Sequence, residues 1–495
     1  MKKAGKQLIL ILIAAILAVI FCSTKCTRKQ PEKANLVIIV ADALRRDVLG
    51  CYGGDVPTPN IDGLARNGVL FKHAYSTAPT TMPSSVSIFT GNYSRVYGVA
   101  MKKITGYPQN FFYYVNDKEK TLSEFLGELG YDVRMDVENK LAYSSNNMQG
   151  FKKFRDFKKL KEREIAEVEN TIGIKNLGRH RTDFLSSNYD RLYDLLFYLL
   201  NVPQDQKFCL VKWFLDPHAP YRPPKKFRKE ISVDPEKLSH RPSFYSQKQH
   251  YDMEKFSDYE KYYLKELYKA EVASLDERVG FIIKALKHRN LLDKTIIVFT
   301  SDHGESFGEM KQWGHGTNFS ECLVHVPLIF MGPGIPVGKI EEDIVSHLDL
   351  MPTLKTLLGI VYDDNMQGKS YDSLFQGETI PIRTPYFDRN RHPSPRMTLG
   401  DVDGLLMDGH KLTVKRKKEK LSFKLFNLTD DPEELNNLAQ ANFNIVQKML
   451  KKIMDIRKSN KLRLKTNQKK INRNINMDKK WKRVRERLKT LGYIE

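Results

Sequence analysis

The stretch NLVIIVADALRRD, from Asn35 to Asp47, decides the fold class, because it joins a buried strand directly to an acidic residue. Residues 36–41 form a continuous apolar run, which is typical of a strand buried on both faces of a parallel sheet. Similar runs follow at 208–215, 295–300 and 326–331, with helical patterns between them. Strands that alternate with helices predict an α/β fold, with a mostly parallel central sheet sandwiched by helices.

Acidic and histidine residues follow three of these runs directly. Asp42 follows the first, Asp216 and His218 follow the second, and Asp302 and His303 follow the third. In open α/β sheets ligands bind beyond the carboxyl ends of the strands, so these residues should meet at one edge. Aspartate and histidine without cysteine favour one divalent cation, Ca²⁺, Mn²⁺, Mg²⁺ or Zn²⁺. We predict that Asp42, Asp302 and His303 hold it, where it would attract an anionic substrate oxygen.

A hydroxyl-rich loop, TAPTTMPSSVSIFTG (77–91), supplies the candidate nucleophile. Pro83 suits the first turn of a helix. Thr81 should then lie just before a helix N-terminus, where free N–H groups favour anions. A hydroxyl there, beside a cation, is a nucleophile for a phosphate or sulfate ester and a further metal ligand. Thr80, Ser84 and Ser85 are rival nucleophiles. Ser84 and Ser85 otherwise either bind substrate or form only capping and turn hydrogen bonds.

The N-terminal segment is typical of export. Three lysines within residues 1–6 precede an unbroken apolar run at 8–21, the layout of a signal peptide or signal anchor. Cys22 follows directly and could be lipidated, which would make the protein a lipoprotein. We expect residues 1–22 to be a signal peptide or membrane anchor and 23–34 to be a linker. The catalytic part should then be periplasmic or extracellular.

The chain is strongly basic, with a net charge of +22 over 495 residues. This charge favours an anionic partner, or else reflects lysine-rich composition together with one basic tail. The tail at 442–495 reads as a helix that either packs on the domain or contacts a membrane surface. Nucleic acid is disfavoured by the export signal and by the lack of a binding motif. The five cysteines form neither a disulfide framework nor a zinc spacing.

Several stretches together resemble the sulfatase family of the alkaline phosphatase superfamily. They are NLVIIVADALRRDVLGCYGG, TMPSSVSIFTG, FLDPHAPY, VFTSDHGE, WGHGTNFSECLVHVPLIFMGPG, DLMPTLKTLLGI and FNLTDDPEELNNLA, in the order that the family has them. The resemblance implies an alkaline phosphatase/sulfatase-like catalytic domain at 35–380, with insertions within 151–260. A small C-terminal α+β subdomain at 381–441, with antiparallel strands and a DG turn, should follow.

The family's nucleophile motif, C/S-x-P-S-R followed by T-G, aligns Thr81 with the nucleophile and Ser85 with the arginine. Sulfatases oxidise cysteine or serine to formylglycine, and the β-methyl group of threonine leaves no route to that aldehyde. Ala43 stands where many members carry a second metal-binding aspartate. The site therefore resembles the one-metal threonine site of lipoteichoic acid synthases and phosphoethanolamine transferases. The resemblance implies that His218 is a general acid or a donor to substrate oxygens, and that His315 is either a second such donor or a turn residue.

Three functions remain open at this point. The leading one is metal-dependent hydrolysis or transfer of a phosphate-type ester through a covalent Thr81 intermediate, with Ser84, Ser85 and Asp216 binding the substrate. The second is hydrolysis of sulfate esters, on a sulfated glycan or small ester, by an unmodified hydroxyl. The third is a catalytically degenerate protein that binds an anionic glycan or lipid without turnover. In each case the partner is anionic: a glycan, a lipid head group or a small molecule.

Overall fold

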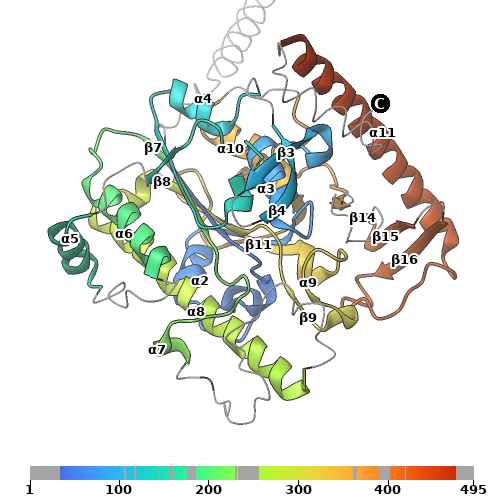
Figure 1. Ribbon diagram of the computed structural model, residues 1–495, viewed down its shortest axis with the longest axis horizontal. Coiled ribbons are helices and arrows are strands. Elements are labelled where there is room, and N and C mark those ends of the chain that lie inside the picture. Colours follow the sequence, from blue (N-terminus) through green and yellow to red (C-terminus); the bar gives the residue numbers. More distant parts are fainter. Residues whose placement is uncertain are drawn as a thin grey trace, which may run out of the picture.

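The computed structural model describes residues 34–104, 107–115, 119–143, 145–154, 160–174, 186–228, 231, 256–360, 365–389, 402–417 and 420–474. A large central sheet has helices on both sides, and a smaller sheet with one long helix lies at the C-terminal end (Figure 1). The predicted signal or anchor segment, much of the two insertions and the end of the tail lie outside the described residues. No described helix is both long and apolar enough to cross a membrane.

The central sheet has eight strands. Their order is β12 (Lys339–Ser346), β2 (Val69–Tyr75), β11 (His325–Met331), β8 (Thr295–Ser301), β1 (Asn35–Ala41), β7 (Phe208–Phe214), β5 (Asp132–Val137) and β6 (Lys152–Lys153). Of these eight, β11 alone is antiparallel to its neighbours, and the other pairs are parallel. The predicted mostly parallel sheet is therefore confirmed.

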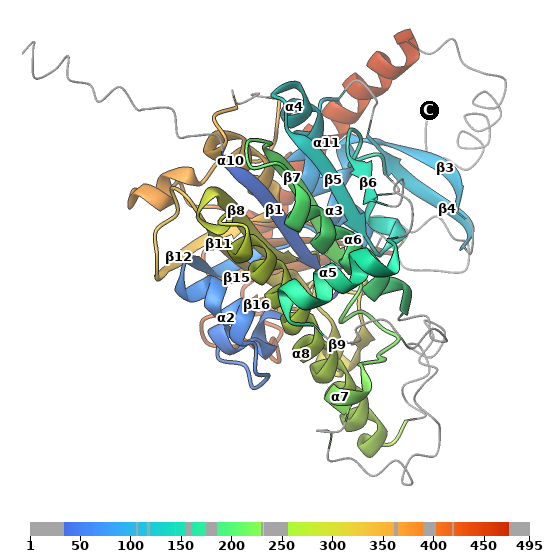
Figure 2. The same ribbon diagram turned by 90° about the vertical axis from the view of Figure 1, so that its left-hand side faces the viewer.

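Helices cover both faces of this sheet because its central strands are apolar on both sides. Along β1, Val37 and Ile39 pack into one core and Ile38 and Val40 into the other. The first core is closed by α2 (Pro59–Arg66), α5 (Glu162–Ile172), α6 (Ser186–Asn201) and α8 (Asp258–His288). The second is closed by α3 (Thr81–Thr90), α4 (Leu122–Glu128) and α10 (Leu350–Leu357). Figure 2 shows α5, α6 and α8 lying together against the strands.

Several shorter elements lie in the connections between the main strands and helices. A hairpin of β3 (Gly98–Ile104) and β4 (Tyr107–Tyr114) extends away from the body beside α3 (Figure 2). The remaining pieces are α7 (Lys225–Arg228), β9 (Ser306–Phe307), β10 (Trp313–Gly314) and α9 (Glu321–Val324).

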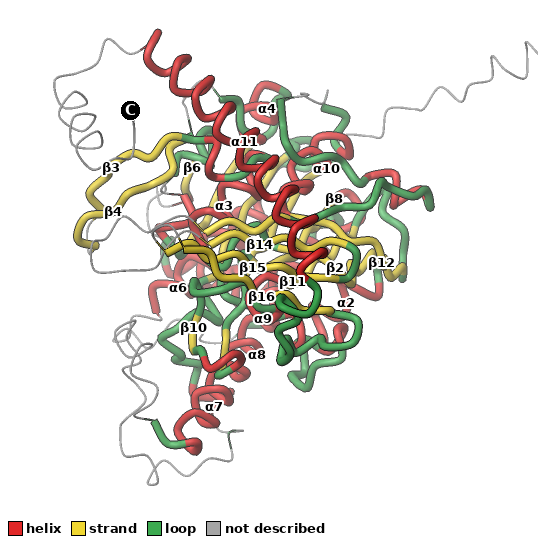
Figure 3. Tube along the Cα trace, turned by 90° about the vertical axis from the view of Figure 1, so that its right-hand side faces the viewer, coloured by secondary structure: helices red, strands yellow, loops and turns green. Residues whose placement is uncertain are grey.

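The second sheet is antiparallel and has four strands: β13 (Tyr386–Arg389), β14 (Val402–Met407), β15 (His410–Lys417) and β16 (Lys420–Asn427). The predicted DG turn joins β14 to β15, with φ of 51° at Asp408 and 72° at Gly409. The long helix α11 (Phe443–Asn474) packs on this sheet through Val446, Met449 and Ile453 (Figure 3). The tail is therefore helical as far as residue 474, and the helix packs on the domain.

Candidate active site

Asp42 lies at the carboxyl end of β1 and is fully buried. Its backbone N–H donates to the Phe214 carbonyl at 3.1 Å, which extends the β1–β7 pairing by one residue. Its Oδ2 accepts from the Asn139 amide at 2.6 Å and from the Trp213 indole at 3.1 Å. Its Oδ1 has no hydrogen-bond partner among the described residues. One oxygen is thus fixed by the protein, and the other is left for a ligand.

Asp302 and His303 follow β8 and repeat this arrangement. Asp302 Oδ1 accepts the N–H groups of Ala43 and His303 at 3.1 and 2.9 Å, whereas within the described chain its Oδ2 has no partner. His303 Nδ1 lies 2.8 Å from the Gly304 carbonyl. Because a carbonyl can only accept, that nitrogen carries the proton, and Nε2 keeps its lone pair.

Three potential ligand atoms converge here. His303 Nε2 lies 3.8 Å from Asp42 Oδ1 and 3.4 Å from Asp302 Oδ2. Burial and the charge of Asp42 raise the pKa of Asp302 well above its ordinary value. Burial and the neighbouring His315 lower the pKa of His303. A divalent cation would hold Asp302 ionised and accept the lone pair of neutral His303, so these residues fit the predicted metal site.

Thr81 is brought to this group by the start of α3. Thr80 is extended, and the helix begins at Thr81, one residue earlier than the sequence predicts. Pro83 in the first turn needs no hydrogen-bond acceptor, which explains why a helix can start here. Thr81 Oγ1 lies 3.4 Å from both His303 Nε2 and the Asn139 amide nitrogen. The candidate nucleophile therefore lies beside the candidate metal ligands.

The two serines of the motif form hydrogen bonds within their own loop. Ser84 Oγ lies 2.9 Å from the Ser76 hydroxyl, which in turn donates to the Asp302 carbonyl at 2.5 Å. Ser85 Oγ donates to the Met82 carbonyl at 2.8 Å. Both serines are fully buried. These contacts match the capping and turn interpretation, and a role of either serine in substrate binding stays a prediction.

His218 and His315 lie together beside the metal-ligand group. Their ring centroids are 5.0 Å apart, and the His315 ring lies 4.4 Å from that of His303. His315 Nδ1 is 3.0 Å from a carboxylate oxygen of buried Glu305. Burial alone would lower the pKa of His315, but the Glu305 carboxylate outweighs burial and raises it. A protonated imidazole at this place suits a proton donor.

Asp216 has a different environment from the other predicted site residues. Its carboxylate pairs with the buried guanidinium of Arg278 on α8, and it is not in the group of ligand atoms around Asp302. Glu271, also on α8, accepts the backbone N–H of Arg222. One helix therefore holds both ends of the segment that carries His218. A contact of Asp216 with substrate stays a prediction.

Sequence reasoning missed three partners of the site: Asn139, Trp213 and Glu305. Asn139 follows β5, whose sequence DVRMDV has charged residues at alternate positions and therefore lacks a continuous apolar run. Trp213 lies inside an apolar run, where nothing distinguishes it from a core residue. Glu305 offered a signal, because it lies only two residues beyond His303 on the same strand end.

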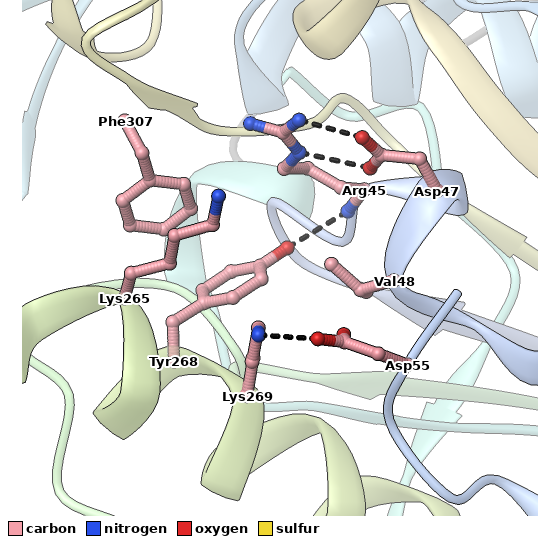
Figure 4. Close-up of a pocket in the computed structure, with 8 residues that line it drawn as sticks. All are labelled: Arg45, Asp47, Val48, Asp55, Lys265, Tyr268, Lys269 and Phe307. Carbon is pink, nitrogen blue, oxygen red and sulfur yellow. Dashed lines mark hydrogen bonds and ion pairs between the residues drawn. The ribbon is translucent and has the colours of Figure 1, made fainter. Parts of the chain in front are cut away.

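A cavity of about 110 Å³ lies behind the loop that follows Asp42 (Figure 4). The Tyr268 hydroxyl accepts the N–H of Arg45 at 2.8 Å and donates to the Ala43 carbonyl at 2.9 Å. The Arg45 guanidinium pairs with Asp47 and with a second carboxylate, so it is already neutralised. No ligand atom of the metal-ligand group lines this cavity. The Tyr268 hydroxyl thus holds the loop in place. The cavity itself is not the reaction pocket. Its lining residues are Arg45, Asp47, Val48, Asp55, Lys265, Tyr268, Lys269 and Phe307.

The fold and the site define an α/β protein with a candidate metal-dependent active site at one edge of its central sheet. The family described as Sulfatase matches residues 34–360, and a second family, described as N-sulphoglucosamine sulphohydrolase, C-terminal, matches residues 309–460. The chain therefore belongs to the sulfatase family and is a hydrolase.

Curated relatives are similar over most of the chain. Arylsulfatase K of Mus musculus is 24% identical over 472 residues, which cover 87% of this chain and 81% of the relative. An arylsulfatase of Clostridium perfringens is 24% identical and covers 83% of this chain and 91% of its own length. An ulvan-active sulfatase of Formosa agariphila is 26% identical over 368 residues, 70% of this chain and 66% of the relative.

Solved structures confirm the predicted fold. The phosphonate monoester hydrolase of Agrobacterium radiobacter has a TM-score of 0.65 at 20% identity and covers 86% of this chain and 96% of its own. A protein crystallised with its substrate D-glucosamine-2-N,6-O-disulfate has a TM-score of 0.62 at 18% identity, with 88% and 99% of the two chains covered.

Proposed function

We propose that this hydrolase cleaves sulfate esters in a metal-dependent reaction that uses the hydroxyl of Thr81. The observation that carries the proposal is the position of Thr81 Oγ1, 3.4 Å from His303 Nε2 and beside two carboxylates. Each carboxylate has one oxygen without a hydrogen-bond partner among the described residues. The relatives named as arylsulfatases and sulfatases support sulfate ester hydrolysis. They favour it over the phosphate-type chemistry that leads among the predictions from the sequence.

The roles of the residues follow from their positions. A divalent ion between Asp42, Asp302 and His303 would supply positive charge to the ester oxygens and to the Thr81 oxygen. Thr81 Oγ1 forms a bond to sulfur as the bond from sulfur to the ester oxygen breaks, and the Thr81 proton passes to water. His315, held by Glu305, gives its proton to the departing alcohol oxygen.

The second half of the reaction releases the product. Water attacks the sulfur and returns a proton to His315, and the bond between Thr81 and sulfur breaks. Thr81 takes up a proton from water, which restores the hydroxyl and frees sulfate. The Asn139 amide, 3.4 Å from Thr81 Oγ1, is a hydrogen-bond donor to this oxygen while its charge is highest.

A second candidate function is hydrolysis of a phosphate-type ester by the same residues. The observation that favours it is the threonine itself, because a covalent threonine intermediate is ordinary chemistry for phosphorus. The structural likeness to a phosphonate monoester hydrolase is consistent with this alternative.

Export remains part of the proposal. The basic residues and apolar run before residue 22 support a place outside the cytoplasmic membrane, where sulfated or phosphorylated polymers are accessible.

The test compares release of nitrophenol from a sulfate ester, a phosphate monoester, a phosphodiester and a phosphonate monoester. Each assay contains Ca²⁺, Mn²⁺, Mg²⁺ or Zn²⁺, and Thr81→Ala is the control. The proposal expects turnover of the sulfate ester that falls at least about a thousandfold in the variant. Turnover of phosphorus esters with an inert sulfate ester would transfer the assignment to the second candidate. Full turnover by the Thr81→Ala variant would contradict both candidate functions, because both use the Thr81 hydroxyl.

A further inference from the structure

The outer face of α11 is exposed to solvent and carries several lysines. The helix runs along the outside of the small sheet, and Figure 3 shows it crossing the surface in front of β14 and β15. Its inner face is fixed by Val446, Met449 and Ile453, which are buried against the sheet. Further along, Arg457 pairs with Asp403 at 2.8 Å, and Asn467 donates to the Val96 carbonyl at 2.9 Å. The helix therefore presents one constant face to solvent.

Lysines at regular spacing dominate this outer face. Lys451, Lys458 and Lys465 are exposed and lie seven residues apart, so they align on the side opposite Met449. In the part of the chain that the structure describes, none of these three lysines forms an ion pair, whereas Lys448 at the edge pairs with Asp408 at 2.9 Å. Lys461 widens the positive strip.

Two large apolar side chains flank the strip. Met454 is 61% exposed and Leu462 is 67% exposed, and each lies within one helical turn of Lys458. The first and last lysines are 14 residues apart, about 21 Å along the axis. Lysines interleaved with exposed apolar side chains on one straight helix face are typical of a helix that lies on a bilayer.

We propose that this face of α11, defined by Lys451, Met454, Lys458, Leu462 and Lys465, docks on an anionic lipid surface. The lysines would contact the lipid phosphates, and Met454 and Leu462 would enter the boundary between head groups and acyl chains. A purely anionic polymer would satisfy the lysines but would leave both apolar side chains in water. An anionic bilayer is therefore the partner that would contact both the lysines and the two apolar side chains.

The experiment measures sedimentation of the full chain with vesicles of phosphatidylcholine, alone or mixed with phosphatidylglycerol. Binding should be stronger to the anionic vesicles and should weaken as salt is added. Lys451→Glu/Lys458→Glu/Lys465→Glu should lower the affinity for anionic vesicles by about tenfold or more. The matched control is Lys225→Glu/Lys287→Glu/Lys294→Glu, which makes the same charge change at exposed lysines of α7, α8 and the turn before β8. It should reduce the affinity much less.

Met454→Ser/Leu462→Ser separates a bilayer from a polymer, because it leaves the charge unchanged. It should weaken binding to anionic vesicles and leave retention on a heparin column unaltered. Equal losses in the two charge-reversal variants, equal binding to neutral and anionic vesicles, or no loss in the serine variant would each overturn the proposal. Thermal unfolding midpoints within a few degrees of the parent exclude misfolding as the cause, since all these side chains are exposed.

Discussion

Asn139 connects the candidate nucleophile to a candidate metal ligand through a single amide group. Its Nδ2 donates to Asp42 Oδ2 and lies 3.4 Å from Thr81 Oγ1, while its Oδ1 accepts the N–H of Leu141 at 2.9 Å. The last contact fixes which end of the amide faces the site. Asn139 therefore orients one carboxylate and donates to the hydroxyl oxygen.

Asn139→Ala should reduce kcat and metal affinity by about 10- to 100-fold, because the oxygen of Asp42 loses its strongest donor. Steady-state kinetics and metal titration would measure both. Asn147→Ala is the matched control, since Asn147 is also buried but donates to the Ala142 carbonyl, which belongs to none of the metal ligands. Equal losses of metal affinity in the two variants would mean that Asn139 acts only through stability.

From the raised pKa of Asp302 we predict how the stability of the protein changes when the metal is removed. Burial and Asp42 raise this pKa in the folded protein, so the unfolded state releases its proton at lower pH. In the metal-free protein, the free energy of unfolding should therefore fall as pH rises above the ordinary aspartate range. A bound cation removes this penalty by favouring the ionised form.

Thermal unfolding with and without a chelator, between pH 5 and 8, measures the effect. The chelator should lower the unfolding temperature, and the difference should grow with pH. Asp302→Asn, which cannot ionise, should flatten that dependence. A chelator effect that shrinks as pH rises would contradict the proposed ligand set.

The structure brings together four residues that the sequence singles out, and each of the four has a local sequence signal. Asp42, Asp302 and His303 each follow an apolar run, and Thr81 precedes a proline that starts a helix. Asn139 had no such signal, because β5 alternates charged and apolar residues. The hydrogen bond between Trp213 and Asp42 depends on how β7 and β1 align, which no local pattern contains.

At the scale of elements, α8 acts as the support for the His218 segment. Arg278 on α8 is buried and pairs with Asp216, two residues before His218. Asp216→Asn would remove the ion pair between this carboxylate and the buried guanidinium, which should cost about 3–5 kcal/mol of stability. We expect kcat to fall because His218 shifts, with KM nearly unchanged.

Denaturant unfolding and steady-state kinetics test this prediction. Asp258→Asn, an exposed change at the first residue of the same helix, is the control and should alter neither quantity much. If KM rises sharply in Asp216→Asn while stability holds, Asp216 contacts substrate directly, as the sequence alone predicts.

The central strands were predictable and the edge strands were not. β1, β7 and β8 are buried on both faces, so each is mainly apolar, although β7 includes the buried Lys212, which pairs with Asp136. β12 lies at the edge with β2 beside it, and both include exposed positions, Lys72 in β2 and Glu342 in β12, which interrupt the pattern. β11 is antiparallel to β8, but its apolar sequence resembles that of a parallel strand, so its direction could not be predicted from the sequence pattern.

At the scale of the whole molecule, the small sheet and α11 depend on each other for a core. Met449 is fully buried between the helix and the sheet, together with Leu412 and Leu425. Met449→Ala should lower the free energy of unfolding by about 2–5 kcal/mol, because the sheet cannot close over the cavity. Met454→Ala, on the exposed face, should cost less than about 0.5 kcal/mol.

Denaturant titration of the two variants would separate these values. Equal effects at positions 449 and 454 would contradict the packing of α11 described here. A large effect at 449 alone would confirm that the basic helix is an integral part of the fold, which the membrane proposal for its outer face requires.

Direct detection of a covalent adduct on Thr81 is the most decisive test of the mechanism. The enzyme would be quenched in acid during turnover of an ester substrate and digested, and the peptide that contains residues 77–91 would be analysed by mass spectrometry. The account predicts a sulfate group on Thr81, or a phosphorus group if the second candidate is correct, and its absence in Thr81→Ala. An unmodified peptide throughout rapid turnover, together with an active Thr81→Ala variant, would contradict the account.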